Sequence, residues 1–204
     1  MFDILLELSK VSVRYLEPEG AREENCSTKS YMEIRELKSF DATSYRELRV
    51  QALAEWPPGF GSLVGEEKEK AMEETESFLT GTTDRKLFGA FAGSMLTGTV
   101  RYSRYSGSNE GHRAYIAGLY VDPGHRRKGA GRALLEKAID ESKKDQTIRR
   151  INLTVVSDQS MAIRLYQSLG FVECGIDYEA FSARGLFFDE ILMTKQIERS
   201  TGNS

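Results

Sequence analysis

The sequence is poor in the residues that build metal sites and disulfide frameworks. Its 204 residues include two cysteines, Cys26 and Cys174, and two histidines, His112 and His125. Two cysteines do not make a disulfide framework, and neither stands in metal-ligand spacing with a histidine. We therefore predict no metal site and two free thiols in a reducing cytoplasm.

Long apolar runs and an excess of positive charge are missing as well. No apolar run approaches the roughly 18 residues of a membrane span, and the start, MFDILLELSK, lacks the basic region and longer apolar core of a secretory signal. The net charge is -3, whereas broad binding to nucleic acid needs clustered lysine and arginine. These absences predict a cytoplasmic protein with no membrane span and no nucleic-acid partner, in which any anion site is local.

The composition and its changes along the chain predict one organised domain. A chain that is 40% hydrophobic and 29% charged is typical of a soluble domain with a single core. Residues 16–30, LEPEGAREENCSTKS, are polar and show no periodicity. We expect residues 1–30 to form a poorly ordered N-terminal extension, residues 31–198 the domain, and residues 199–204 a polar tail.

Hydrophobic periodicity predicts an α/β (α+β) domain. A strand near Met32 precedes a helix that must end before Pro57, since proline disfavours helical geometry in the residue before it. A second helix is expected in GEEKEKAMEETESFL, with its charges on a solvated face. Gly93-Ser94 predicts a hairpin, and further strands and helices alternate after it. The predicted segments are RAYIAGLYV, residues 129–144, RRINLTVV, SMAIRLYQSLG, FVECGIDYEA and LFFDEILMTKQI.

The most informative segment is VDPGHRRKGAGR, residues 121–132, between a predicted buried strand and a helix. Its glycines allow a ligand to approach the backbone, and the first amides of the helix have no intrahelical partner. The helix dipole and nearby arginine and lysine side chains add positive charge at that end. The segment therefore predicts an anion site. A glycine-rich turn with basic residues that solvate the helix start is the structural alternative.

Two other phosphate-binding patterns fail on this segment. A Walker loop requires G-x-x-x-x-G-K-[ST], which the sequence lacks. A dinucleotide fingerprint requires G-x-G-x-x-G/A, but the sixth position counted from Gly129 is Leu134, and no acidic residue ends a strand about 20 residues further on. Neither nucleotide-binding class is favoured.

The segment resembles motif A of the GNAT N-acetyltransferases, Q/R-x-x-G-x-G/A, through Arg126, Gly129 and Gly131. The later stretch SMAIRLYQSLGF is similar to the family signature N-x-x-A-x-x-L-Y-x-x-x-G-F, and DEILMTK resembles the usual last strand. The similarity spans residues 32–197. It implies the GNAT fold, a mixed central sheet of about six to seven strands flanked by about four helices.

The resemblance also implies acetyl-CoA as the acyl donor. In the family, backbone amides of the loop hold the pyrophosphate, the preceding strand bonds the pantetheine arm, and that strand and the next splay apart. One departure is Gln159, where the family often has asparagine. The residues implied to bind the cofactor are Leu119, Tyr120, Val121, Arg126, Arg127, Lys128, Gly129, Ala130, Gly131, Arg132, Gln159 and Ala162.

Tyr166 is the predicted catalytic residue, as the proton donor to the departing thiolate. At helical spacing from Ala162 it also fits a core aromatic residue. The general base stays open. The family positions for glutamate or histidine correspond to Tyr115 and Ala117, which are poor bases, while Glu110 and His112 could act through water. Transfer of the amine proton to solvent is a further alternative.

The acceptor pocket is expected, by analogy with the family, between the first two helices and the last hairpin. A small primary amine is the favoured acceptor, and a protein amine is second. A GNAT-like module that binds acetyl-CoA without turnover is the alternative function, and a homodimer is possible. The candidate lining residues are Trp56, Phe60, Glu66, Glu67, Tyr178 and Phe181.

Overall fold

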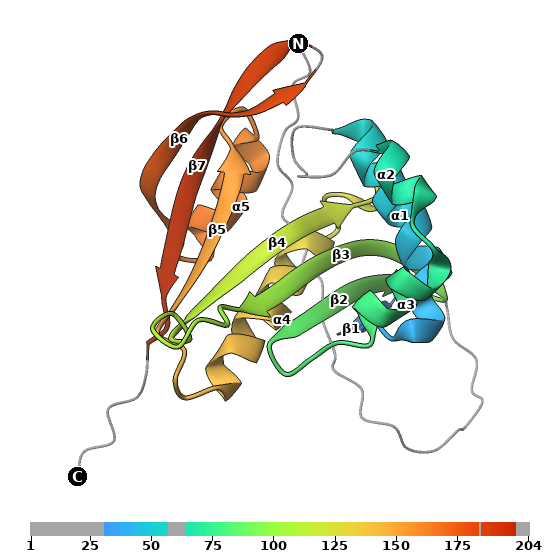
Figure 1. Cartoon of the computed structure of the whole chain (residues 1–204), viewed down its shortest axis with the longest axis horizontal. Coiled ribbons are helices and arrows are strands. Elements are labelled where there is room, and N and C mark those ends of the chain that lie inside the picture. The colour runs from blue at the N-terminus through green and yellow to red at the C-terminus, as the bar shows by residue number, and fades with distance from the viewer. Residues whose placement is uncertain (1–30, 57–63, 184, 199–204) are drawn as a thin grey trace.

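The computed structural model describes residues 31–56, 64–183 and 185–198, which form a seven-stranded sheet in the order β1-β2-β3-β4-β5-β7-β6 (Figure 1). Neighbouring strands are antiparallel except β4 and β5. The predicted extension and tail, with Cys26 and Phe60, lie outside the described residues. The strands are β1 (Met32–Glu36), β2 (Arg85–Ala92), β3 (Met95–Arg104), β4 (Arg113–Val121), β5 (Arg150–Val156), β6 (Val172–Ala183) and β7 (Leu186–Gln196).

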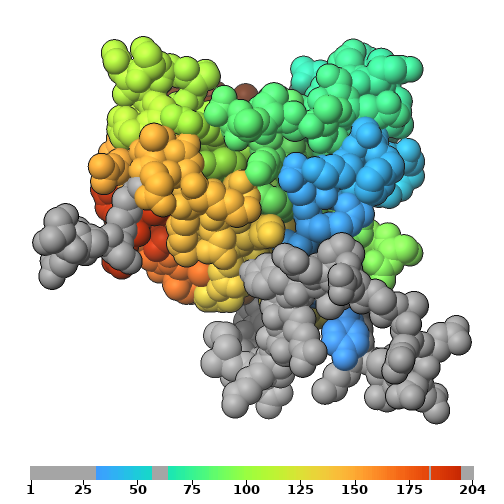
Figure 2. Space-filling view, turned by 90° about the horizontal axis from the view of Figure 1, so that it is seen from below, coloured from blue at the N-terminus to red at the C-terminus, as the bar shows by residue number. Residues whose placement is uncertain are grey.

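Helices cover both faces of this sheet, because alternate residues of its strands point to opposite sides. On β2, Phe88 and Ala90 belong to the core under α4 (Ala130–Lys144) and α5 (Ser160–Ser168). Leu87 and Phe91 belong to a second core with α1 (Ala42–Glu55) and α3 (Met72–Leu79). Seen from below, the yellow-to-gold α4 lies beside the blue N-terminal elements (Figure 2). The predicted mixed sheet with helices on its faces is confirmed.

The prediction of one charged helix after residue 63 is wrong. The segment forms α2 (Val64–Glu69) and then α3, with Ala71 extended between them at φ −62° and ψ 149°. This sequence has no continuous apolar stripe to hold one long helix, so each half packs separately. The charges are not all solvated either, because Glu67 is only 4% exposed. The described chain therefore has five α-helices instead of about four.

The feature that positions the site is the partial pairing of β4 with β5. Their parallel ladder has three residue pairs and ends at Tyr115 and Asn152. Beyond it, β4 carries a bulge against β3, at which Gly118 adopts φ +62°. The carboxyl halves of the two strands diverge (Figure 1), so the predicted splaying of these strands is confirmed.

Candidate active site

The loop after β4 is held in shape by Asp122. Its backbone amide donates to Thr97 O (2.8 Å), and its carboxylate accepts bonds from the Gly124 amide (2.9 Å) and Gln51 Nε2 (2.7 Å). The His125 ring, with Nδ1 2.9 Å from the same carboxylate, lowers the pKa of Asp122 most, followed by Gln51. A charged Asp122 thus fixes the path of the chain from β4 toward α4.

The second half of this loop presents unbonded backbone amides. Arg127 and Gly129 are both left-handed, at φ 61° and φ 87°, and Gly129 caps α4. Within the described residues, the amides from Arg127 to Arg132 donate to no acceptor. Successive free amides at a helix start favour an anion such as a phosphate. The predicted anion site therefore has a backbone geometry that suits its ligand.

The basic side chains of the loop mostly bind the protein itself. Arg126 pairs with Glu55 at 2.6 Å and donates from Nε to Val121 O. Lys128 donates to Gly124 O, and Arg132 donates to Ser168 Oγ. These side chains add positive charge near the anion site while they hold its walls. The backbone amides would therefore be the main groups that bind the anion.

The end of β4 divides its side chains between the two faces. Leu119 and Val121 pack against the core under α4, whereas Tyr120 points to the α1 face. The Tyr120 hydroxyl donates to Glu55 Oε2 at 2.6 Å. Burial is the main cause that raises the pKa of Tyr120, and Glu55 is the second cause. The Tyr120 side chain therefore belongs to the pocket face.

Tyr166 on α5 is 7% exposed and packs edge-on against Phe171. Burial is the main cause that raises the pKa of Tyr166, and Tyr115 contributes as a second cause. The phenol is therefore neutral at physiological pH and keeps a proton to donate. Ala162 packs against the same core, and Gln159, which caps α5, donates from its side chain to Asp158.

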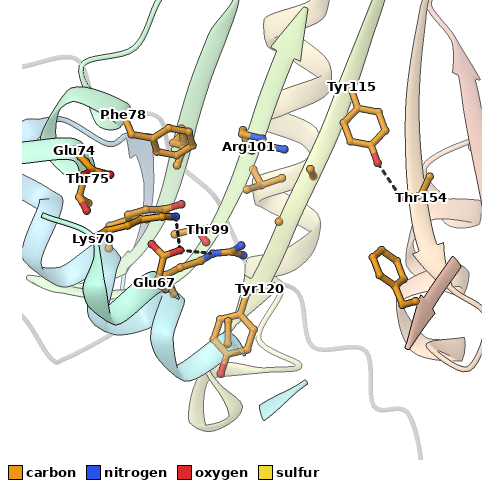
Figure 3. A pocket seen from close by; sticks show the side chains of 18 of the residues that line it. Glu67, Lys70, Glu74, Thr75, Phe78, Thr99, Arg101, Tyr115, Tyr120 and Thr154 are labelled. Carbon is orange, nitrogen blue, oxygen red and sulfur yellow. Dashed lines mark hydrogen bonds and ion pairs between the residues drawn. The ribbon is translucent and has the colours of Figure 1, made fainter. Parts of the chain in front are cut away.

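A cavity of about 490 Å³ lies beside the split, between the helices α1 to α3 and the strands (Figure 3). Glu67 in its wall accepts from Lys70 at 2.8 Å and lies 3.9 Å from Arg49 Nε. Arg101 of β3 also lines the cavity, and Tyr115 and Thr154 lie on the side of the split. The cavity size is in the range of small-molecule sites.

Three residues of this wall form a hydrogen-bonded chain that sequence reasoning missed. Tyr115 Oη lies 2.8 Å from Thr154 Oγ1. Burial raises the pKa of Glu190 on β7, and hydrogen bonding by Thr154 opposes this effect. The available signal was strand alternation, because Ile191 and Met193 face the core under α4 and therefore turn Glu190 to the other face.

The other candidate bases lie away from the series Tyr115, Thr154 and Glu190. Glu110 and His112 precede β4 at its amino end, and Glu110 pairs with Arg113. His112 is exposed. Ala117 does line the cavity, but it has no titratable group. The geometry thus favours Glu190 over both loop residues as a proton acceptor.

The predicted acceptor residues are only partly assembled. Glu67 and Phe181 line the cavity. Trp56 instead packs edge-on against Phe188, and Tyr178 is 72% exposed on the terminal hairpin. Glu66 is exposed on α2, outside the lining.

The sequence model of the Acetyltransferase (GNAT) family matches residues 34–171. The chain belongs to the GNAT acetyltransferase family. This confirms the predicted family and fold, and it supports the predicted acyltransferase class with acetyl-CoA as cosubstrate. The matched range contains the loop after β4, the split and Tyr166.

Curated GNAT relatives differ in their acceptors. Spermidine N(1)-acetyltransferase of Vibrio cholerae is 33% identical over 93 residues, 44% of this chain and 54% of that protein. The [ribosomal protein bS18]-alanine N-acetyltransferase of Escherichia coli is 38% identical over 84 residues, 41% of this chain and 56% of that protein. These matches span about half of each relative, so they leave the acceptor of this GNAT chain open.

Solved GNAT structures match more of the chain. An acetyltransferase of the GNAT family from Streptococcus pneumoniae has a TM-score of 0.73 and 28% identity, over 81% of this chain and 99% of that one. YncA from Salmonella typhimurium, solved with its cofactor acetyl-CoA, also has a TM-score of 0.73, with 20% identity over 86% and 99% of the two chains. The second likeness is one of fold.

Two features are absent from residues 31–56, 64–183 and 185–198. No helix there is long and apolar enough to cross a membrane. No group of three or more histidine, cysteine, aspartate or glutamate side chains there could hold a metal ion. The cytoplasmic location and the homodimer stay predictions.

Proposed function

We propose that this chain is an N-acetyltransferase that transfers the acetyl group of acetyl-CoA directly to an amine. The observation that carries the proposal is the split between β4 and β5, with an anion-binding loop at the end of β4 and a cavity beside it. A thioester in the split would meet an amine from the cavity, so the fold supplies the positioning that direct transfer needs.

In this proposal the free amides from Arg127 to Arg132 hold the pyrophosphate of coenzyme A. Arg126 fixes the loop through Glu55. The backbone of residues 119–121 bonds the pantetheine arm, and Ala162 leaves room for it beside Tyr166. The side chain of Gln159 is bonded to Asp158, so we assign no separate contact to it.

The reaction forms one C–N bond and breaks one C–S bond. The neutral amine attacks the thioester carbonyl carbon, and the tetrahedral intermediate expels the thiolate of coenzyme A. The nitrogen loses one proton, which we assign to Glu190 through Thr154 and Tyr115. Tyr166 donates a hydrogen bond or a proton to the departing sulfur.

A small primary amine is the acceptor that the cavity favours. Its walls come from α1, α2, α3 and the six strands β2 to β7, and its volume of about 490 Å³ suits a small molecule. A protein amino terminus is the second candidate. Turnover of a peptide with a free amino terminus, in the absence of turnover of small amines, would favour it.

The test combines binding with turnover. Calorimetry measures the affinity for acetyl-CoA, and a thiol reagent measures coenzyme A release with polyamines, amino acids, amino acid amides and a peptide. Acetyl-CoA binding with amine-dependent release supports the enzyme. Tight binding with no release for any amine would identify a sensor or scaffold module instead.

A further inference from the structure

Arg101 is the basic residue of the cavity wall whose charge the described protein leaves unmatched. It is half-buried on β3, and its Nε is buried with no hydrogen-bond partner. In residues 31–56, 64–183 and 185–198, no hydrogen bond or ion pair engages its guanidinium. The other two cations of the wall, Arg49 and Lys70, lie against Glu67.

The neighbours of Arg101 explain why it stays unmatched. Its register partners are Leu87 on β2 and Ala117 on β4, which carry no charge. The aromatic residues Tyr45 and Tyr115 line the same cavity as Arg101. Figure 3 shows Arg101 between Phe78 and Tyr115. The small Ala117 leaves open space beside it.

A guanidinium in this setting recognises a planar anion. Its fork of donors matches a carboxylate with two parallel hydrogen bonds, and a partly buried site strengthens such a bond. A polycation is disfavoured at the same place, since Arg101 would repel it. The cavity wall therefore presents an unmatched cation at Arg101 and a proton acceptor at Glu190.

We propose that the acceptor is a small amine that also bears a carboxylate, such as a free amino acid, and that Arg101 binds this carboxylate. The inference rests on the proposed acetyltransferase function. Tyr115 stands two residues from Ala117, the register partner of Arg101, which is about 7 Å along a strand. An amino acid can thus place its carboxylate at Arg101 and its amine at the split.

The experiment compares amino acids with their own amides, which keep the amine and side chain but lack the carboxylate. The amide has a lower ammonium pKa, so the decisive quantity is the change in the acid-to-amide ratio of kcat/KM on mutation. Arg101→Gln should lower this ratio at least about 10-fold and leave the amides within about threefold. Arg101→Lys should keep part of the preference.

Lys70→Gln is the matched control, because it removes a cavity cation that Glu67 already neutralises. It should leave the ratio unchanged, and thermal melting checks that each variant folds. An unchanged ratio in Arg101→Gln overturns the inference, as does a wild-type protein that uses polyamines or amides but no amino acid. Those outcomes leave the proposed function standing. Absence of turnover with every amine overturns both.

Discussion

The hydroxyl oxygens of Tyr115 and Thr154 lie 2.8 Å apart across the split between β4 and β5. Burial raises the pKa of Glu190, and hydrogen bonding by Thr154 lowers it, so Thr154 also faces this carboxyl group. An ionised carboxylate only accepts, so Thr154 must donate to Glu190 and accept from Tyr115. The three groups thus form a one-way path from the split to a base, which gives Tyr115 a role that its own pKa would not allow.

Replacement of Glu190 by glutamine should remove the base. We expect kcat to fall roughly 10²-fold, together with the acid limb of its pH profile. Burial raises the pKa of Glu190, so this limb should lie above the range of an ordinary carboxyl group, and activity should rise with pH through it. Because burial penalises the charged form, the glutamine variant should melt no lower than wild type at pH 7.

Asp177→Asn provides the control for this pH profile. Asp177 is the register partner of Glu190, and its charge raises the pKa of Glu190 after burial does. Its neutralisation should move the acid limb to lower pH and keep the maximal rate. An acid limb that persists in Glu190→Gln would assign proton removal to the amine itself or to solvent.

Gly129→Glu should abolish acetyl-CoA binding. The residue is left-handed at φ 87° and starts α4, so a side chain adds strain of roughly 1–2 kcal/mol and a negative charge beside the free amides. Gly93→Glu is a matched control, because Gly93 is left-handed at φ 61° in the β2–β3 turn and has open space around it. Unchanged affinity in calorimetry for a folded Gly129→Glu protein would remove the basis of the site.

Most of the fold could be predicted because its signals are local. Gly93, Gly129 and Gly170 each mark a turn or helix end, and all three have positive φ. The error after residue 63 arose where local signals are weak, since charges without an apolar stripe do not distinguish one helix from two. The burial of Glu67 and its approach to Arg49 depend on the packing of α2 against α1. The sequence of α2 alone does not predict that packing.

The same difference between local and long-range signals applies to the residues of the site. The loop from Arg126 to Arg132 is contiguous, so its pattern could be recognised in the sequence. The path from Tyr115 to Glu190 joins three strands, and the unmatched charge of Arg101 depends on what its neighbours lack. Such relationships arise only when strands far apart in the sequence are brought into register.

Asp41→Asn should destabilise the protein at neutral pH. Arg35 donates two 2.7 Å bonds to Asp41, which also accepts from the Lys38 amide at 2.8 Å. The bond from Arg35 is the main reason that the pKa of Asp41 is lowered. Its stabilisation is therefore present above the unfolded-state pKa and lost as pH falls through the folded-state value.

We expect a loss of about 2 kcal/mol at pH 7, in the range for hydrogen bonds to charged groups, and a much smaller loss near the acid end. Urea unfolding at several pH values measures both. Asp140→Asn is the control, since its pair with Lys143 is exposed on both sides and such pairs contribute little. An equal loss at all pH values would show that the charge of Asp41 is not the cause.

Tyr166→Phe should lower kcat and leave acetyl-CoA affinity nearly unchanged. The ring is buried against Phe171, and phenylalanine keeps this packing, so only the hydroxyl is lost. That hydroxyl is neutral at physiological pH because burial raises the pKa of Tyr166, and it can donate to the sulfur on which charge develops. Loss of a general acid should lower kcat by roughly 10²-fold, the low end for such catalysis.

Tyr102→Phe is the control. It removes another buried tyrosine hydroxyl, from β3 under α4, and should leave kcat unchanged. If chemistry limits the rate and Tyr166→Phe retains full kcat with the best acceptor, Tyr166 is a packing residue, and coenzyme A leaves as a thiolate without its help.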